Sequence, residues 1–212
     1  MFIDVDCYEE LYLKDKSEDV LRREITRMRS ELQRMKRKME SPVYASDDYR
    51  RYPSELKNIS VCRAYLQRAL EYASKMEMGV EVLTEEERAA MLVNSWNSMI
   101  VGVSLTVGRH FEYGYYAVVN DDSISLTKTK RDCEDEVSVL TRAEFFGAMN
   151  ELYLGEWRDS YTPEQYGCTL NEPNKWHLRI DYSDGIAPRF YEGEGVYPYN
   201  FDILCKLLNA EK

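Results

Sequence analysis

The first strong pattern in the chain is a helical one over residues 17–41. Apolar side chains recur there at alternating spacings of four and three residues, the heptad pattern of a helix that buries one narrow seam. Ser17 precedes the pattern as an N-cap, and Pro42 ends it because proline disfavours a helical residue before it. The seam consists of Leu21, Ile25, Met28, Leu32, Met35 and Met39.

A second helix, predicted over residues 54–78, leaves two arrangements open for this seam. In a parallel dimer, Glu24 and Glu31 of one copy would face Arg29 and Lys36 of the other, which favours a homodimer that pairs the six seam residues. The alternative is a hairpin within one chain, in which the two helices bury the same seam. The residues before the first helix alternate weakly and are expected to form a short strand or an irregular arm.

After Met99 the apolar period changes from 3.6 to 2, which is typical of strands with one buried face. A capping box at Thr84 starts a helix before these strands, and the order βββ-α-ββ-α follows. This order predicts an α+β fold, an antiparallel sheet with helices against one face. The elements expected after residue 100 are strands over 101–107, 111–119 and 124–126, a helix after Thr141, strands over 176–182 and 186–191, and a helix after Asn200.

Charge separates a helical region, residues 1–80, from an acidic α+β domain, residues 81–212. The first carries 16 basic and 15 acidic side chains and the second carries 12 and 23, so the domain accounts for the net charge of −10. An acidic domain repels nucleic-acid backbones and favours a basic protein partner; a charge that serves solubility alone is the alternative. The basic helix over residues 20–38 would instead attract a nucleic-acid backbone. Its candidate nucleic-acid contacts are Arg27, Arg34 and Arg37.

Composition points to a cytoplasmic protein. No apolar run reaches the ~20 residues of a membrane span, and the N-terminal residues do not resemble a secretory signal. The five cysteines are widely spaced and none belongs to a Cys-x-x-Cys pair, which is typical of a reducing compartment.

Catalytic and metal-binding motifs are not evident. The two histidines, His110 and His177, belong to no ligand cluster, and Cys168, His177 and Asp181 carry no signature of a nucleophilic triad. The acidic run at residues 132–136 lacks the ligand spacing of a calcium loop and is expected to be solvated. We therefore expect no enzyme, no cofactor and no metal, with an enzyme that lacks a recognisable motif as a minor alternative.

Aromatic residues near the C-terminus form three short motifs. They read W-x-x-x-Y at 157–161, W-x-L-x-I-x-Y-x-x-G at 176–185 and Y-P-x-N-F at 197–201. In these motifs residues 100–208 resemble a module of small uncharacterised proteins from Firmicutes and their mobile elements. The chain departs from that pattern at Asn174-Lys175, where the module has an Asp-Gly turn, and at Gly195, where it has Asn. The resemblance implies no catalytic residue, and Asn200 in the last motif is expected to cap the final helix.

Tyrosine is frequent, with seventeen in the chain and ten after residue 110. Exposed tyrosines beside carboxylates suit a protein-binding surface. We expect a non-catalytic protein-binding module, an acidic inhibitor or immunity-type protein (anti-CRISPR-like) that acts on a basic nucleic-acid-handling partner. The alternative is a nucleic-acid-binding accessory protein that uses the basic helix. The candidate partner-binding residues are Tyr115, Tyr116, Asp181, Asp184, Tyr191, Glu192 and Glu194.

Overall fold

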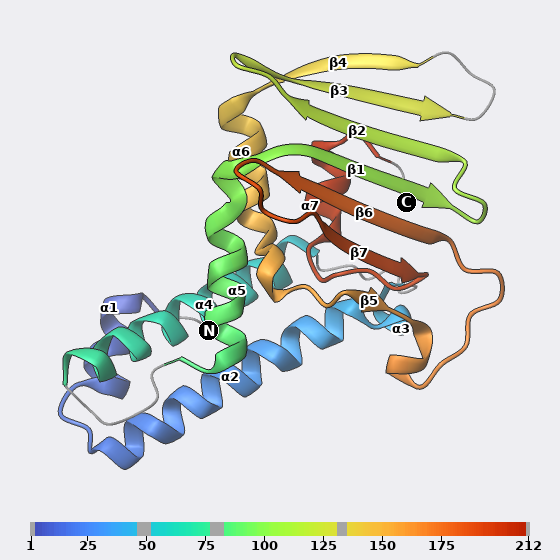
Figure 1. Ribbon diagram of the computed structural model, residues 1–212. Helices are drawn as coiled ribbons and strands as arrows, with labels where there is room; N and C mark the ends of the chain where they lie inside the picture. Colours follow the sequence, from blue (N-terminus) through green and yellow to red (C-terminus); the bar gives the residue numbers. More distant parts are fainter. Residues whose placement is uncertain (1–2, 46–51, 77–82, 131–134, 211–212) are drawn as a thin grey trace. The chain divides into compact units, whose positions relative to one another are not determined.

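The computed structural model describes residues 3–45, 52–76, 83–130 and 135–210, and the chain divides into two compact units (Figure 1). We call Met1–Glu85 unit 1 and Glu86–Lys212 unit 2. All strands of the described part of the chain lie in unit 2, where they combine with helices. The predicted α+β class is therefore confirmed.

Unit 1 is helical throughout its described residues. The segment that was expected to be a strand or arm is instead a short helix followed by a π-helix, because the Asp4 side chain accepts a hydrogen bond from the Asp6 N–H and caps the first turn. The helices of unit 1 are α1 (Val5–Tyr8), η1 (Glu9–Leu13), α2 (Glu18–Glu40), α3 (Pro42–Ala45) and α4 (Tyr52–Lys75).

The heptad seam of α2 is buried within one chain. Five of its six residues are between 1% and 9% exposed, and Met35 is half-buried. Helix α4 packs along α2, and the Cys62 Sγ on α4 lies 3.6 Å from the Met28 carbonyl oxygen. The structure thus supports the intramolecular hairpin. The alternative, a homodimer through the same seam, is not supported, because these side chains are already largely buried within one chain, where α4 packs along α2. The residues that this dimer would pair are Leu21, Ile25, Met28, Leu32, Met35 and Met39.

Unit 2 forms a seven-stranded sheet in the order β4-β3-β2-β1-β6-β7-β5, antiparallel except between β5 and β7. Two strands were not predicted, β4 in the segment after the acidic run and the two-residue β5. The strands are β1 (Ile100–Gly108), β2 (Tyr113–Val119), β3 (Ser123–Lys130), β4 (Glu136–Thr141), β5 (Ser160–Tyr161), β6 (Lys175–Tyr182) and β7 (Arg189–Glu194). The helices are α5 (Glu85–Ser95), η2 (Trp96–Met99), α6 (Arg142–Leu152), η3 (Leu154–Glu156), η4 (Pro163–Tyr166) and α7 (Phe201–Leu207).

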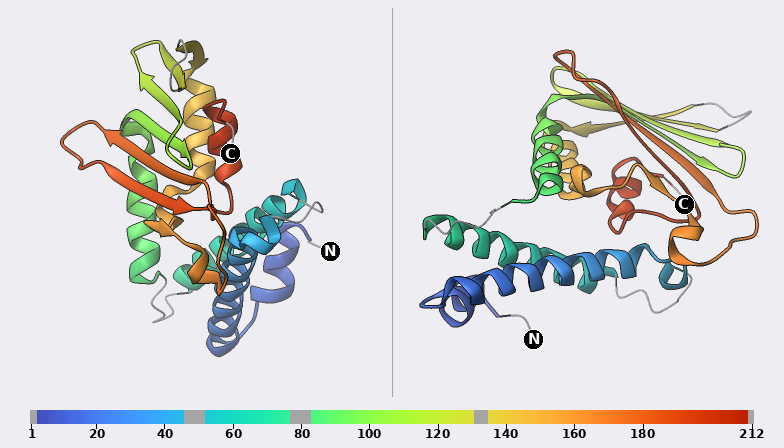
Figure 2. Two further views of the ribbon diagram at one scale, coloured as in Figure 1. Left: turned by 90° about the vertical axis from the view of Figure 1, so that its right-hand side faces the viewer. Right: turned by 60° about the horizontal axis from the view of Figure 1, so that its bottom comes forward.

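Helices α6 and α7 lie against one side of the sheet, as both views of Figure 2 show. Side chains that point to this side are buried; Leu105 on β1 is in register with Tyr115 on β2 and with Leu178 on β6, and each is at most 1% exposed. We call the opposite side of the sheet the open face. Its side chains alternate with the buried ones along the central strands β2, β1 and β6.

The ends of α6 and α7 are fastened by side-chain hydrogen bonds. Thr141 and Glu144 form the predicted capping box at the start of α6. Asn200 stands at the N-cap position of α7 but makes no capping hydrogen bond, which corrects its expected role. Its side chain is instead buried, donating to the Leu152 carbonyl oxygen at 2.7 Å and accepting from the Trp157 Nε1 at 2.9 Å.

Candidate functional site

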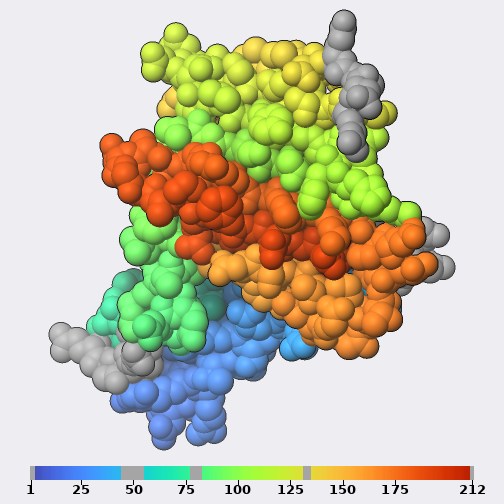
Figure 3. Space-filling view, turned by 45° about the vertical axis from the view of Figure 1, so that its right-hand side comes forward, coloured from blue at the N-terminus to red at the C-terminus, as the bar shows by residue number. Residues whose placement is uncertain are grey.

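The open face is the candidate functional site of unit 2, and β6 shows how the sequence builds it. Trp176, Leu178, Ile180 and Tyr182 are buried, whereas the residues between them point outward. Strands β2, β1 and β6 come to the surface side by side, seen as green and orange bands in Figure 3.

Charged residues occupy the β6–β7 half of the open face, and acids alternate with bases there. The Lys175 Nζ lies 2.9 Å from the Glu194 Oε1, and the Arg179 Nη2 lies 2.7 Å from the Asp181 Oδ1. Most of these side chains are about half exposed, so the pairs contribute little to stability. This half of the face therefore offers hydrogen-bond donors and acceptors to a partner, and its carboxylates form ion pairs with neighbouring lysine and arginine side chains.

Phe190 on β7 adds a large apolar side chain to this charged half. It is 61% exposed, and the Arg179 guanidinium lies over its ring at 5.7 Å from the centroid. Beside it, the His177 Nε2 is 3.4 Å from the Glu192 Oε2, and the imidazole packs against Phe111. An exposed aromatic ring ringed by charged groups is the usual composition of a protein-binding hot spot.

The other half of the open face carries exposed apolar side chains on β2 and β4, with Ser125 and Thr127 of β3 between them. Val118 is in register with Ser125 and Val139, and Tyr116 is in register with Thr127 and Val137. Val118, Val137 and Val139 are 53%, 68% and 65% exposed. Sequence reasoning identified Tyr116 here but missed the valines of β4, because β4 was not predicted and these valines point to solvent instead of to the core.

The structure separates the seven predicted partner-binding residues into two groups. Tyr116, Asp181, Glu192 and Glu194 point to the open face, and Asp184 is exposed in the turn after β6. Tyr115 and Tyr191 are each 1% exposed, so the expectation that they contact a partner is wrong. Both belong to the core-facing set of their strands, and the Tyr191 hydroxyl donates to the Leu154 carbonyl oxygen at 3.0 Å.

The structure does not bring together the three candidate triad residues, Cys168, His177 and Asp181. The Cys168 Sγ contacts the Pro163 carbonyl oxygen, whereas His177 lies beside Glu192 and Asp181 pairs with Arg179, so the three candidate triad members have separate partners. No group of three or more His, Cys, Asp or Glu side chains among the described residues could hold a metal ion. Most of the acidic run lies outside the described residues, and Cys133 with it. The four described cysteines, Cys7, Cys62, Cys168 and Cys205, are free thiols.

The basic helix pairs its arginines with its own glutamates. Arg27 donates to Glu24 and Arg34 donates to Glu31, in each case through Nε and Nη2. A hydrogen bond to Glu31 raises the pKa of the Arg34 guanidinium. Arg37 is exposed near the end of α2. A carboxylate beside each guanidinium offsets its charge and would repel an approaching phosphate, so Arg27 and Arg34 are weaker candidates for nucleic-acid binding than unpaired arginines.

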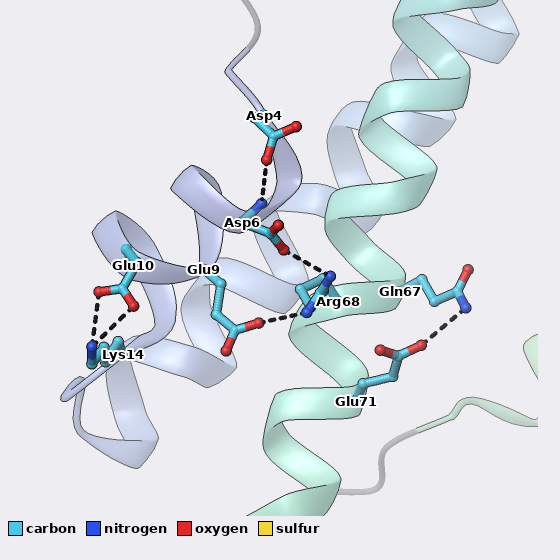
Figure 4. A network of polar contacts seen from close by, with 8 residues as sticks. All are labelled: Asp4, Asp6, Glu9, Glu10, Lys14, Gln67, Arg68 and Glu71. Atoms are coloured by element: carbon cyan, nitrogen blue, oxygen red, sulfur yellow. Dashed lines mark hydrogen bonds and ion pairs between the residues drawn. The ribbon is translucent and has the colours of Figure 1, made fainter.

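The N-terminal segment of unit 1 is held on α4 by charge. Arg68 donates to Glu9 at 2.9 Å and to Asp6 at 3.1 Å, as Figure 4 shows. Beneath this pair, the buried Tyr8 hydroxyl donates to the Glu24 carboxylate at 2.8 Å. Burial alone would raise the pKa of Glu24, but hydrogen bonds from Arg27 and Tyr8 outweigh it and lower the pKa below its usual range. This network joins α1, α2 and α4 and is structural in character.

No helix in the described ranges is both long and apolar enough to cross a membrane. Comparisons of the chain with protein-family models, with curated proteins and with solved structures find no match.

Proposed function

We propose that unit 2 is a non-catalytic protein-binding module whose open face is the docking surface. One observation carries this proposal: large apolar side chains are exposed together on a sheet face that α6 and α7 leave uncovered. Exposed apolar side chains beside charged residues on one uncovered face are typical of a surface that binds another protein.

The proposed partner is a basic protein. Asp181, Glu192 and Glu194 lie around Phe190 on the open face, and residues 81–212 carry 23 acidic against 12 basic side chains. A basic partner could bind these carboxylates in place of Lys175 and Arg179, while its apolar side chains cover Phe190. Within this proposal, the chain acts as an acidic inhibitor or immunity-type protein, similar in kind to anti-CRISPR proteins. Its target would be a basic protein that handles nucleic acid in the cytoplasm. The resemblance to the Firmicutes and mobile-element module is the remaining support for that class.

The test is affinity capture from the source cells with the full chain and two variants. Phe190→Ala removes the exposed ring of the open face, and Leu92→Ala removes a similarly exposed side chain from α5. We expect basic partners to be lost with Phe190→Ala, kept with Leu92→Ala, and released by salt because Debye screening weakens charge steering. Partners that are acidic, indifferent to salt or captured equally by both variants would refute the proposal.

The nucleic-acid alternative has less support. Its candidate residues Arg27 and Arg34 are paired with glutamates, as described above. Charge reversal of Arg27, Arg34 and Arg37 distinguishes the two proposals, because retention on heparin or DNA should depend on these residues only if α2 binds nucleic acid.

A further inference from the structure

The two edges of the sheet differ in how they are protected. One edge is β5, which has only two residues, and short edge strands resist pairing with other chains. The other edge is β4, which has six residues, five of them exposed and one half-buried. Its register with β3 is continuous from Ser123 to Lys128, without a bulge, and its sequence contains neither proline nor lysine. Of the features that keep an edge from pairing, the strand has one, the charged Glu136 at its first position.

The sequence of β4 is complementary to itself in an antiparallel pairing. Val137-Ser138-Val139 reads the same in both directions around Ser138. If a two-fold axis passes through Ser138, Val137 of one copy lies opposite Val139 of the other, and both valines point to the open face. Such directly opposite β-branched side chains stabilise a strand pair.

Charge favours the same orientation. Asp135 and Glu136 lie at the start of β4, and Arg142 directly follows its end. Antiparallel pairing brings the carboxylates of each copy near Arg142 of the other, whereas parallel pairing would bring like charges together. Both groups can still interact with a second copy. Glu136 is mostly exposed, and its ion pair with the Lys128 Nζ is long, at 3.9 Å. Arg142 donates one hydrogen bond to the Asn120 carbonyl oxygen, and its guanidinium has further N–H donors.

We propose that β4 pairs antiparallel with β4 of a second copy of this chain, so that the sheet continues across a two-fold axis. This interface uses none of the α2 seam residues, and it is separate from the β6–β7 half of the open face. It also joins the exposed valines of the two copies into one patch, which accounts for apolar side chains that the fold of one chain leaves in water.

The test measures the molar mass of the full chain by sedimentation equilibrium from about 1 μM to about 1 mM, a range that spans weak and moderate dimer affinities. Val139→Lys places two cations beside the axis, and Val118→Lys is its matched control on the same face but away from the edge. We expect a wild-type dimer, a dissociation constant raised at least about tenfold by Val139→Lys, and no change with Val118→Lys. A wild-type monomer throughout, or equal effects of both variants, would overturn the proposal.

Three further variants test the orientation and the interface independently. Glu136→Arg should weaken the dimer, and adding Arg142→Glu should restore it, because the exchanged charges again attract across the axis. Glu31→Lys would weaken a parallel α2 dimer but leave β4 pairing unchanged. Failure of the double variant to recover, or sensitivity to Glu31→Lys, counts against pairing through β4. Circular dichroism of each variant confirms that its fold is intact.

Discussion

At the scale of single residues, the choice between core and surface follows from strand register. Tyr115 and Tyr116 are adjacent, and their sequence surroundings are equally apolar, so composition alone could not say which one is exposed. Register resolves the choice, because Tyr115 lies opposite the buried Leu105 and Tyr116 lies opposite Ser104. Asn200 makes a similar point, since its position at a helix start was predictable but its bonds to Leu152 and Trp157 depend on tertiary packing.

Two buried tyrosines differ in whether the hydroxyl is hydrogen-bonded and should respond oppositely to its loss. The Tyr182 hydroxyl is buried and has no hydrogen-bond partner among the described residues. The Tyr191 hydroxyl donates to the Leu154 carbonyl oxygen and accepts from the Arg189 Nε. We expect Tyr182→Phe to be neutral or stabilising and Tyr191→Phe to lower the free energy of unfolding by about 1 kcal/mol, measured by urea denaturation at pH 7. A loss of stability in Tyr182→Phe would contradict this account.

The pH dependence of Tyr182→Phe follows from the same burial. Burial raises the pKa of the Tyr182 hydroxyl to about 12, above its value in the unfolded chain. A raised pKa gives stability that is complete below the unfolded pKa of about 10 and is lost as the pH rises toward 12. Phenylalanine does not ionise, so the stability of Tyr182→Phe relative to wild type should increase between these pH values. A constant difference would show that Tyr182 ionises equally in both states.

At the scale of elements, a glycine just past the end of a helix commonly serves as its C-cap, yet the C-cap of α6 is Tyr153, with a left-handed φ of 48°. Gly155 is needed for close approach instead, because a Cβ there would lie 2.1 Å from the Ala90 carbonyl oxygen. Gly155→Ala should therefore lower the free energy of unfolding by at least about 2 kcal/mol. Gly147→Ala, in open space on α6, should raise it by up to about 1 kcal/mol. Urea titrations of both variants, followed by tryptophan fluorescence, measure the contrast.

Helix α2 holds α1 in place through Glu24, which should make unit 1 sensitive to acid. Glu24→Gln should cost about 2 kcal/mol near neutral pH, because the carboxylate accepts charged hydrogen bonds while buried. The lowered pKa of Glu24 gives stability that is present above its unfolded pKa and is lost as the pH falls through the folded value. The difference between variant and wild type, measured by circular dichroism, should thus shrink below about pH 4.

Glu31→Gln is the matched control for Glu24→Gln, because Glu31 also pairs with an arginine three residues later on α2. Its side chain is 39% exposed, against 10% for Glu24, so its removal should change stability by less than about 0.5 kcal/mol. Equal effects of the two substitutions would show that burial of Glu24 does not decide its contribution.

At the scale of the whole molecule, the α+β class and most elements were predictable because their apolar residues face the core with a clear period. Strand β4 was missed because its apolar and polar positions are exchanged relative to an ordinary half-buried strand. Its valines face solvent, and Ser138 is among the residues that face the core. The exposed valines of β4 were left out of the candidate site for the same reason. The α2 seam was recognised, but a heptad pattern is the same whether its partner is a second copy or α4.

Unit 2 has its own closed core, so residues 86–212 should fold when produced alone. All three tryptophans, Trp96, Trp157 and Trp176, lie in this unit, and Trp157 and Trp176 are packed edge to face. We expect the fragment to keep the near-ultraviolet circular dichroism and the tryptophan emission maximum of the full chain. A red-shifted emission and a flat near-ultraviolet spectrum would show that unit 2 requires unit 1 to fold.

The pairing of β1 with β6 has a consequence for synthesis on the ribosome. The partner of Leu105 on that side is Leu178, so one flank of β1 has no neighbour until more than seventy further residues have been translated. A nascent sheet of β1 to β4 would therefore have β1 as an apolar edge strand that still lacks its partner β6. Translation speed through residues 109–182 and access of chaperones to this intermediate should therefore govern the yield of native protein.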